Sequence, residues 1–306
     1  MTGVSVVVAT RNRPERLRAL LDSLAAQAGP AFELIVVDDA SDVPVAAGRA
    51  RVIRVPVHSG PGPARNAGWR AAGGDLIAFI DDDCTARPGW LAALAAAHAR
   101  DADAVIQGRT EPDPAEAPRL AAFTRSQSVT SGPGPWFQTC NIAYPRALLE
   151  RLGGFDESFG DDPGEDTDLA WRAIESGARV VFEPAAPAWH AVHEPGALAL
   201  LRASQKWRVS VRNVARHPQL PSALHRGVFW KPSHERLLWA TAGMLLLGRR
   251  APALALAATL PYLALHRREH GSLAGTATAL PAHVALDGAE LVAMLRGSAH
   301  SRTLVL

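Results

Sequence analysis

The chain has 306 residues, enough for one large domain or two modest ones, and its apolar fraction of 48% is ample for a hydrophobic core. Its only two cysteines, Cys84 and Cys140, exclude a disulfide-rich secreted fold and favour a reducing compartment. Residues 1–8 lack a basic segment and a cleavage site, so we expect a first strand there rather than a signal peptide.

The net charge of +2 hides a strong asymmetry along the chain. Residues 1–199 contain 18 Lys/Arg and 26 Asp/Glu (18 − 26 = −8), whereas residues 200–306 contain 14 and 4 (14 − 4 = +10). This split predicts two regions with different roles and an anionic partner for the second. Nucleic acid and anionic lipid both satisfy that charge, but the apolar blocks between the basic residues favour lipid.

Short apolar segments alternate with helical patterns over the first hundred residues. Because apolar residues recur there with strand or helix periodicity, we predict strands at 4–9, 34–37, 52–55 and 76–80, and helices at 16–27, 63–72 and 90–98. Continuous apolar strands separated by helices predict an α/β fold, with a mostly parallel sheet and helices on both faces. Ligands of such sheets bind beyond the carboxyl ends of the strands.

Residues 111–118 and 131–135 are rich in proline and glycine and are candidate mobile loops. After residue 197 the pattern changes to a basic helix at 198–216 and two apolar blocks at 237–247 and 251–265. Neither block reaches the roughly 20 residues of a spanning helix. We therefore expect interfacial helices or a re-entrant pair, the alternative being a helical subdomain packed on the sheet.

Three consecutive carboxylates, Asp81, Asp82 and Asp83, follow the apolar segment 76–80. Gathering them near a buried strand is unfavourable, because they repel one another and lose hydration. A divalent cation with a bound diphosphate would remove that cost, and oxygen ligands suit Mg²⁺ or Mn²⁺. A second acidic cluster occupies 164–168, and the leading interpretation is a nucleotide-diphosphate site.

Six motifs together resemble the family 2 glycosyltransferases of the nucleotide-sugar-binding GT-A fold. The resemblance covers about residues 3–195 and does not extend to the last third of the chain. Its motifs occur in the order and approximate spacing of the family: VSVVVATRNR at 4–13, ELIVVDDAS at 33–41, GPARNAG at 62–68, IDDD at 80–83, GGFDE at 153–157 and GEDTDLAWR at 164–172.

The resemblance implies inverting transfer of a sugar from a nucleotide-diphospho-sugar donor to an acceptor hydroxyl, with Mn²⁺ or Mg²⁺. Asp81 and Asp83 match the Asp-x-Asp metal motif, with Asp83 on the cation and Asp81 on ribose or on the metal through water. His190 matches a further metal ligand of some relatives, and His193 is the alternative. A lone histidine is also commonly structural.

The nucleotide contacts implied by the resemblance come from four segments. Asp39 is expected to contact the base or ribose while Asp38 supports the turn, but an Asp-Asp pair after a strand is also typical of an ordinary turn. For Arg65 the alternative is a solvated arginine on the helix surface. The candidate nucleotide-binding residues are Thr10, Arg11, Arg13, Asp39, Arg65, Asn66, Asp81 and Asp82.

Asp166 is the candidate catalytic base, because inverting transfer needs a carboxylate that deprotonates the acceptor hydroxyl. Glu165 is the second candidate, and carboxylates that open a helix are also routine N-caps. Trp136 either lines the acceptor pocket or belongs to the core. Both cysteines are expected to be buried and unreactive.

We therefore predict a catalytic domain at 1–197, with a nucleotide-binding half at about 1–110 and an acceptor-binding half at about 111–197, followed by a basic helical region at 198–306. The acceptor is a saccharide or a lipid-linked molecule, and the chain is expected in the cytoplasm at the inner face of the membrane, without nucleic acid. Three other functions stay open: a nucleotidyltransferase, although residues 1–199 contain no lysine for an activating loop; a degenerate binding module; and a dehydrogenase, although Gly-x-Gly-x-x-Gly is absent.

Overall fold

The structure is a computed structural model that describes residues 3–306, and it divides into two compact units. The sheet unit comprises residues 3–118 and 126–192, and the helical unit comprises 119–125 and 193–306. The segment 119–125 therefore belongs with the C-terminal helices, although the predicted boundary at residue 197 assigns it to the catalytic domain.

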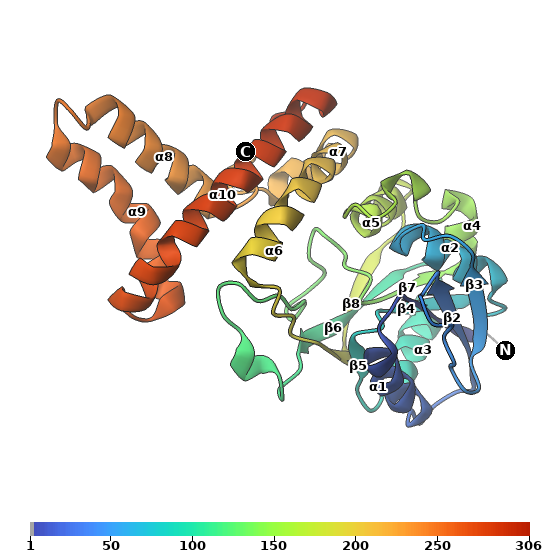
Figure 1. Cartoon of the computed structure of the whole chain (residues 1–306). Coiled ribbons are helices and arrows are strands. Elements are labelled where there is room, and N and C mark those ends of the chain that lie inside the picture. Colours follow the sequence, from blue (N-terminus) through green and yellow to red (C-terminus); the bar gives the residue numbers. More distant parts are fainter. Residues whose placement is uncertain (1–2) are drawn as a thin grey trace. The chain divides into compact units, whose positions relative to one another are not determined.

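The sheet unit is built on one eight-stranded sheet in the order β3-β2-β1-β4-β7-β6-β8-β5 (Figure 1). The pairs β1–β2, β2–β3, β1–β4 and β6–β8 are parallel, whereas β4–β7, β6–β7 and β5–β8 are antiparallel. The sheet is thus mixed, with its parallel half formed by the first four strands. The strands are β1 (Val4–Thr10), β2 (Phe32–Asp39), β3 (Arg51–Val55), β4 (Leu76–Ile80), β5 (Cys84–Ala86), β6 (Val105–Pro112), β7 (Asn141–Pro145) and β8 (Val180–His190).

Helices cover both faces of this sheet, as the sequence predicts. Alternate residues of β1 point to opposite faces: Val6 and Val8 pack with α1 and α3, whereas Val7 packs with α2 and α5. Two hydrophobic cores therefore hold the sheet between them. The helices of this unit are α1 (Pro14–Ala25), α2 (Pro61–Ala71), α3 (Trp90–Arg100), α4 (Arg146–Leu152) and α5 (Glu165–Glu175), with short 3-10 turns at Ala117–Arg119 and Glu157–Phe159.

The strands and helices predicted in the first hundred residues are confirmed, with every end within two residues of the predicted one and the strand at 76–80 agreeing at both ends. β7 enters the sheet from the second half of the chain and runs antiparallel to β4. Its apolar residues Ile142 and Tyr144 pack on one face of the sheet while Ala143 packs on the other. The period of such a five-residue strand does not reveal its partner or its direction.

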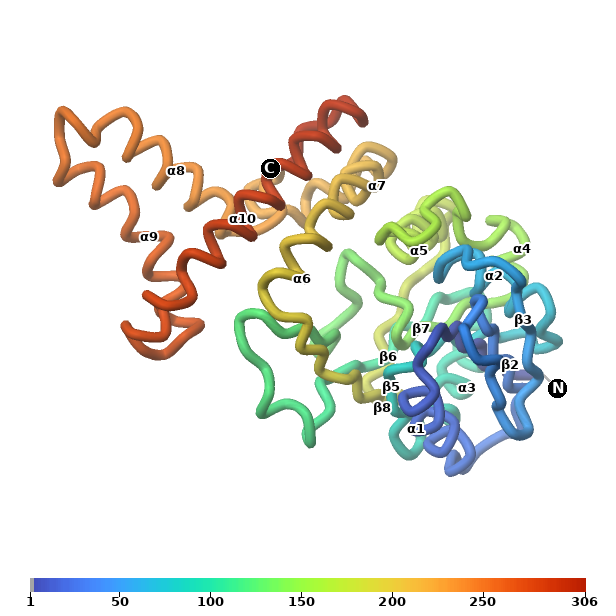
Figure 2. Tube along the Cα trace, in the orientation of Figure 1, coloured from blue at the N-terminus to red at the C-terminus, as the bar shows by residue number. Residues whose placement is uncertain are grey.

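The helical unit begins with a helical stretch that is less regular than the single basic helix expected at 198–216. α6 (Gly196–Ala203) continues through a 3-10 segment, Ser204–Val209, into α7 (Ser210–Arg216), and a further 3-10 turn covers Leu220–Ala223. Both apolar blocks are helical: α8 (Pro232–Leu247) and α9 (Pro252–His270) form an antiparallel hairpin, after which α10 (Leu273–Ser301) runs back along the unit (Figure 2).

α10 is long and apolar enough to cross a membrane by length and composition, and it is the only described helix that meets both criteria. A core helix of a soluble domain meets the same criteria. One third of its most apolar window is buried, and its acidic residues Asp287 and Glu290 are buried within the helical unit.

Candidate active site

Polar residues at the ends of three strands, namely Thr10, Asp38 with Asp39, and the run Asp81–Asp83, lie at one edge of the sheet. β2, β1 and β4 are adjacent and parallel, so the residues that follow Thr10, Asp38 and Ile80 emerge side by side. The connection to β7 adds nothing to this edge, because β7 runs the opposite way. This arrangement is the usual position of a ligand site in an open α/β sheet.

The middle carboxylate of the acidic run is held inside the protein. Asp82 is 4% exposed, and it accepts hydrogen bonds from the Thr10 hydroxyl at 2.7 Å and from the Arg13 guanidinium at 2.9 Å. Arg13 also donates to Asp83 at 3.0 Å. Burial, together with the neighbouring Asp83 carboxylate, raises the pKa of Asp82 to about 6, although Arg13 and Thr10 oppose that rise. Asp82 therefore links the ends of β1 and β4.

Asp83 and His190 form the part of this site best suited to a divalent cation. The Nε2 atom of His190 lies 3.6 Å from Oδ1 of Asp83, and its Nδ1 atom lies 2.7 Å from the carbonyl oxygen of Ala191. A proton on Nδ1 satisfies that carbonyl and leaves the Nε2 lone pair facing the carboxylate, which is the usual arrangement of a ligating histidine. Donor type and orientation therefore fit Mn²⁺ or Mg²⁺.

Cys84 lies within reach of the same two side chains but does not suit the role of a ligand. Burial, with the neighbouring Cys140, raises the pKa of the Cys84 thiol well above its ordinary value. Its Sγ atom lies 3.5 Å from the carbonyl oxygen of Cys140. A thiol must lose its proton to bind a metal, so Cys84 stays a buried packing residue here.

A buried arginine joins the metal motif to the second acidic cluster. Arg65 is 7% exposed, and its guanidinium donates to Asp81 at 2.7 Å and to Glu165 at 2.8 Å. Burial by itself lowers the pKa of Arg65, but the carboxylates of Asp81 and Glu165 raise it above its ordinary value. Residues 100 positions apart are thus fixed in one site by a single side chain.

Asp166 opens α5 beside this bridge. Its Oδ1 atom accepts a hydrogen bond from the backbone N–H of Thr167 at 2.7 Å, and Glu165 is committed to Arg65. Burial, together with the adjacent Glu165 carboxylate, raises the pKa of Asp166 from its ordinary 3.8 to about 8. A carboxylate with a pKa near neutral pH is suited to accepting a proton during a reaction.

Asp39 is held by donors that sequence reasoning missed. Its carboxylate accepts hydrogen bonds from the backbone N–H groups of Ser59 and Gly60 at 2.9 and 3.0 Å, and lies 2.7 Å from Nδ1 of His58. The other ring nitrogen of His58 lies 2.6 Å from Asp161, and this hydrogen bond, followed by the one to Asp39, raises the pKa of His58. The sequence around His58 does not indicate that it lies between Asp39 and Asp161.

The neighbouring Asp38 supports the turn, as expected. It accepts hydrogen bonds from the backbone of Ser41 at 2.8 Å and Val45 at 3.3 Å and pairs with Arg54 at 2.5 Å. Burial alone raises its pKa, but these donors, Ser41 first, lower it below its ordinary range.

Asn66 has the geometry of a structural residue. It is fully buried, its Nδ2 donates to the carbonyl oxygen of Phe155 at 2.9 Å, and its Oδ1 accepts from Phe155 N–H at 2.9 Å. It therefore fastens the GGFDE segment to α2. Gly60, at the start of α2, allows a close approach to the backbone of Gly160. Its φ is +93°, and a Cβ there would clash with the carbonyl oxygen of Gly160.

The remaining predicted residues lie around this centre. Arg11 is exposed at the end of β1. Trp136 is half-buried, and its carbonyl oxygen accepts from the Thr167 hydroxyl at 2.8 Å, next to Asp166. His193 belongs to the helical unit, where its N–H donates to the carbonyl oxygen of Arg125 at 2.8 Å. Of the two candidate histidines, only His190 accompanies Asp83.

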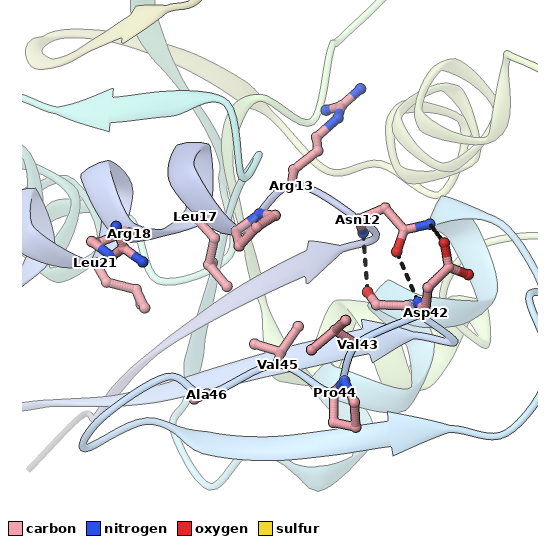
Figure 3. Close-up of a pocket in the computed structure, with 12 residues that line it drawn as sticks. Asn12, Arg13, Leu17, Arg18, Leu21, Asp42, Val43, Pro44, Val45 and Ala46 are labelled. Atoms are coloured by element: carbon pink, nitrogen blue, oxygen red, sulfur yellow. Dashed lines mark hydrogen bonds between the residues drawn. The ribbon is translucent and has the colours of Figure 1, made fainter.

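A pocket of about 540 Å³ lies beside the carboxylate centre, between α1 and the loop after β2. Figure 3 shows Leu17 and Leu21 of α1 across from Val43 and Val45, with Asn12 bonded to the loop at one end. Asn12 accepts from the backbone N–H of Asp42 at 2.8 Å and donates to its carboxylate at 3.2 Å. Its mostly apolar lining differs from that of the charged centre.

Comparison with known proteins decides the family. Residues 5–151 match the family model described as glycosyl transferase family 2. The chain is 30% identical over 283 residues to validoxylamine A glucosyltransferase of Streptomyces hygroscopicus subsp. jinggangensis, covering 76% of this chain and 67% of the relative. The chain belongs to glycosyltransferase family 2.

Other members of the family are longer. The family 2 chain is 34% identical over 206 residues to pre-mycofactocin glycosyltransferase of Mycobacterium tuberculosis, covering 61% of this chain and 42% of that protein. Among solved structures, mannosyltransferase PcManGT from Pyrobaculum calidifontis, in complex with GDP-Man and Mn²⁺, aligns with a TM-score of 0.59 at 21% identity over 97% of this chain and 87% of its own. This likeness confirms the predicted GT-A fold.

Proposed function

We propose that the chain is a metal-assisted, inverting glycosyltransferase that moves a sugar from a nucleotide-diphospho-sugar to an acceptor hydroxyl. The observation that carries this proposal is the Arg65 bridge, which joins Asp81 of the metal motif to Glu165 beside the candidate base. Family membership and the nucleotide-sugar complex of the mannosyltransferase support the donor class.

Asp83 and His190 would hold Mn²⁺ or Mg²⁺, with Asp81 contacting the ribose or reaching the cation through water. The bound cation would neutralise charge on the leaving diphosphate. Arg13 lies beside this position on Asp82 and Asp83 and can turn towards the phosphates, because its side chain is 48% exposed. The family resemblance supports this division, and the orientation of His190 agrees with it.

Asp166 would accept the proton of the acceptor hydroxyl as the new glycosidic bond forms. Its raised pKa keeps the deprotonated form basic enough for this step, and Glu165 keeps the Arg65 bridge in place. Trp136, whose carbonyl oxygen accepts from the Thr167 hydroxyl next to Asp166, would line the acceptor side. Inversion is what the family resemblance implies, and a single carboxylate acting as base agrees with it.

Thr10, Arg11, Arg13 and Asp39 would contact the nucleotide, with His58 positioning Asp39. Two other predicted contacts receive different roles: Asn66 positions the GGFDE segment, and Asp82 positions the strand ends. Both side chains are buried and committed to protein partners. We therefore assign them to the support of the site.

The helical unit offers an apolar surface of the kind that binds at a membrane interface. On the α8–α9 hairpin, Trp239, Leu245 and Leu256 are between 62% and 79% exposed, and Arg249 and Arg250 lie at the turn. Apolar side chains with flanking arginines match an anionic lipid surface. We propose a peripheral contact of this hairpin with the cytosolic membrane face and a saccharide or glycolipid acceptor of the cell envelope.

The experiment that tests the transfer function is a panel of UDP-, GDP- and dTDP-sugars with Mn²⁺ or Mg²⁺, assayed by nucleoside diphosphate release and thermal shift. Wild type is compared with Asp83→Ala and Asp166→Asn. We expect one nucleotide class to stabilise wild type and Asp166→Asn, but not Asp83→Ala, and diphosphate release in wild type only. Metal-dependent binding without turnover for any donor or acceptor tested would instead indicate a degenerate binding module.

The membrane contact has a separate test, flotation with vesicles of phosphatidylcholine with or without phosphatidylglycerol. Wild type should float with the anionic vesicles, and the variant Leu245→Glu should not. A chain that stays unbound to both kinds of vesicle would contradict the membrane contact and leave the transfer proposal intact.

A further inference from the structure

We propose that the helical unit contains a second, structural metal site, formed by His266, Glu269 and His270 of α9 and His283 of α10, that takes Zn²⁺ or a similar transition-metal ion. The site does not depend on the proposed transfer function. It lies in the part of the helical unit after residue 193, beyond the family match, which ends at residue 151.

The sequence places three of these ligands on one helix face. His266, Glu269 and His270 are spaced i, i+3, i+4 in the last turn of α9, so their side chains project to the same side. α9 ends there at Gly271, whose φ is +64°, and Ser272 caps α10 by accepting from the backbone N–H of Gly275. This short turn leads directly into α10 (Figure 2). His283 of α10 lies within ligand distance of His266 and Glu269.

Donor atoms of His266, Glu269 and His283 all lie within 4.8 Å of one another, and His270 joins them through His283. Nδ1 of His266 lies 2.7 Å from Oε2 of Glu269, Nε2 of His283 lies 3.9 Å from the same oxygen, and Nε2 of His270 lies 2.8 Å from Nε2 of His283. Imidazole nitrogen and carboxylate oxygen are both common ligands of Zn²⁺, and imidazole favours transition-metal ions.

The site is held in the interior and has an entrance. His266 and His283 are 3% and 6% exposed and stack with ring centroids 3.9 Å apart, whereas the Glu269 side chain is 43% exposed. Glu269 therefore offers a solvent-facing route for the ion.

One buried nitrogen indicates that the hydrogen-bonded arrangement is incomplete without a further group. Nε2 of His266 has no hydrogen-bond partner among residues 3–306, and it faces Oδ2 of Asp287 from 3.8 Å. With an ion on Nδ1, the proton of this ring sits on Nε2, and Asp287 becomes the carboxylate that orients a metal-bound imidazole. Asp287 is itself held there by the Tyr262 hydroxyl at 2.9 Å.

A neighbouring cluster with similar residues provides a contrast. His234, Asp287 and Glu290 are also close enough to share an ion, but Nζ of Lys231 lies 2.6 Å from Glu290 and supplies the positive charge. The cluster around His266 contains no lysine or arginine contact of this kind in the described residues. It is therefore the one of the two that a cation would complete.

The test uses the full, untagged chain after dialysis against a chelator. Zn²⁺ content is measured by elemental analysis, Co²⁺ is added to read tetrahedral coordination from its visible absorption, and the melting temperature is followed with and without Zn²⁺. We expect about one tightly held Zn²⁺, a tetrahedral Co²⁺ spectrum, and a melting temperature higher by several degrees, since ligand binding stabilises the folded state.

Two ligand variants and two controls separate this site from the carboxylate centre of the sheet unit. Glu269→Gln and His283→Gln should weaken Zn²⁺ binding about tenfold or more and abolish the thermal shift. Glu269→Gln should keep the fold, because it is nearly isosteric and the Glu269 side chain is 43% exposed. Asp83→Ala and His300→Gln should retain both. Binding that is lost in Asp83→Ala but kept in the ligand variants, or no Zn²⁺ binding in wild type, would overturn the proposal.

Discussion

Replacing Asp166 by asparagine should raise stability while removing activity. The pKa of Asp166 is raised from 3.8 to about 8 by burial and the Glu165 carboxylate, so the folded protein favours the protonated form. As the pH rises from about 4 to about 8, the unfolded chain releases this proton while the folded chain retains it. The wild type therefore loses stability over that window.

The size of the effect follows from the shift. About four pKa units correspond to roughly 6 kcal/mol at full development, above pH 8. Because the Asp166 side chain keeps partial contact with water, we expect a smaller gain for Asp166→Asn, about 1–3 kcal/mol at pH 8 and close to zero at pH 4. The amide oxygen can still accept the Thr167 N–H, so the start of α5 is preserved.

Denaturant unfolding between pH 4 and pH 9 measures this gain, and diphosphate release measures the loss of transfer, which we expect to be about 10²- to 10⁴-fold. For the wild type, kcat/KM should rise with pH through the pKa of Asp166. The matched control is Asp168→Asn on the same helix: Asp168 is 1% exposed and accepts from Arg172 at 2.7 Å, so its loss should destabilise at pH 8. A destabilised Asp166→Asn, or one with wild-type turnover, would refute the reasoning.

Three other substitutions test the support of the site. Arg65→Met leaves two carboxylates without their buried partner and should cost about 3–5 kcal/mol in unfolding free energy; an unchanged denaturation midpoint would argue against the bridge. Gly60→Ala drives a Cβ against the Gly160 carbonyl and should lower the melting temperature. Gly48→Ala is the control for backbone strain, because Gly48 also has a positive φ (+57°) but its Cβ would meet nothing within 4 Å, so it should lower the melting temperature less. His190→Asn should weaken Mn²⁺ binding in a titration about tenfold or more, so an unaltered affinity would remove His190 from the metal site.

Much of the sheet unit was predictable because its signals are local. The unbroken apolar run Val6, Val7 and Val8 predicts a strand buried on both faces. The carboxylates after residues 76–80 indicate the end of a strand, because they would be costly to bury within it. Three adjacent parallel strands then bring Thr10, Asp39 and the acidic run to one edge without further information.

The pairings inside the site were not predictable in this way. Arg65 meets Glu165 across 100 residues, and His58 meets Asp161 across 103, because both contacts depend on how the second half of the chain returns to the sheet. The sequence does not distinguish the buried Arg65 from a solvated arginine, or the bridging His58 from an isolated histidine.

The sequence by itself carried the six motifs by which the chain resembles its family. It also determined the strand and helix positions of the first hundred residues and the residues of the acidic motifs, because periodicity and charge clustering act over a few residues. Only the tertiary structure decided that β7 joins the sheet antiparallel, that segment 119–125 belongs with the helical unit, and that His266 and His283 stack in its interior. Those features rest on contacts between residues far apart in the chain, whose free energy appears only when the whole fold brings them together.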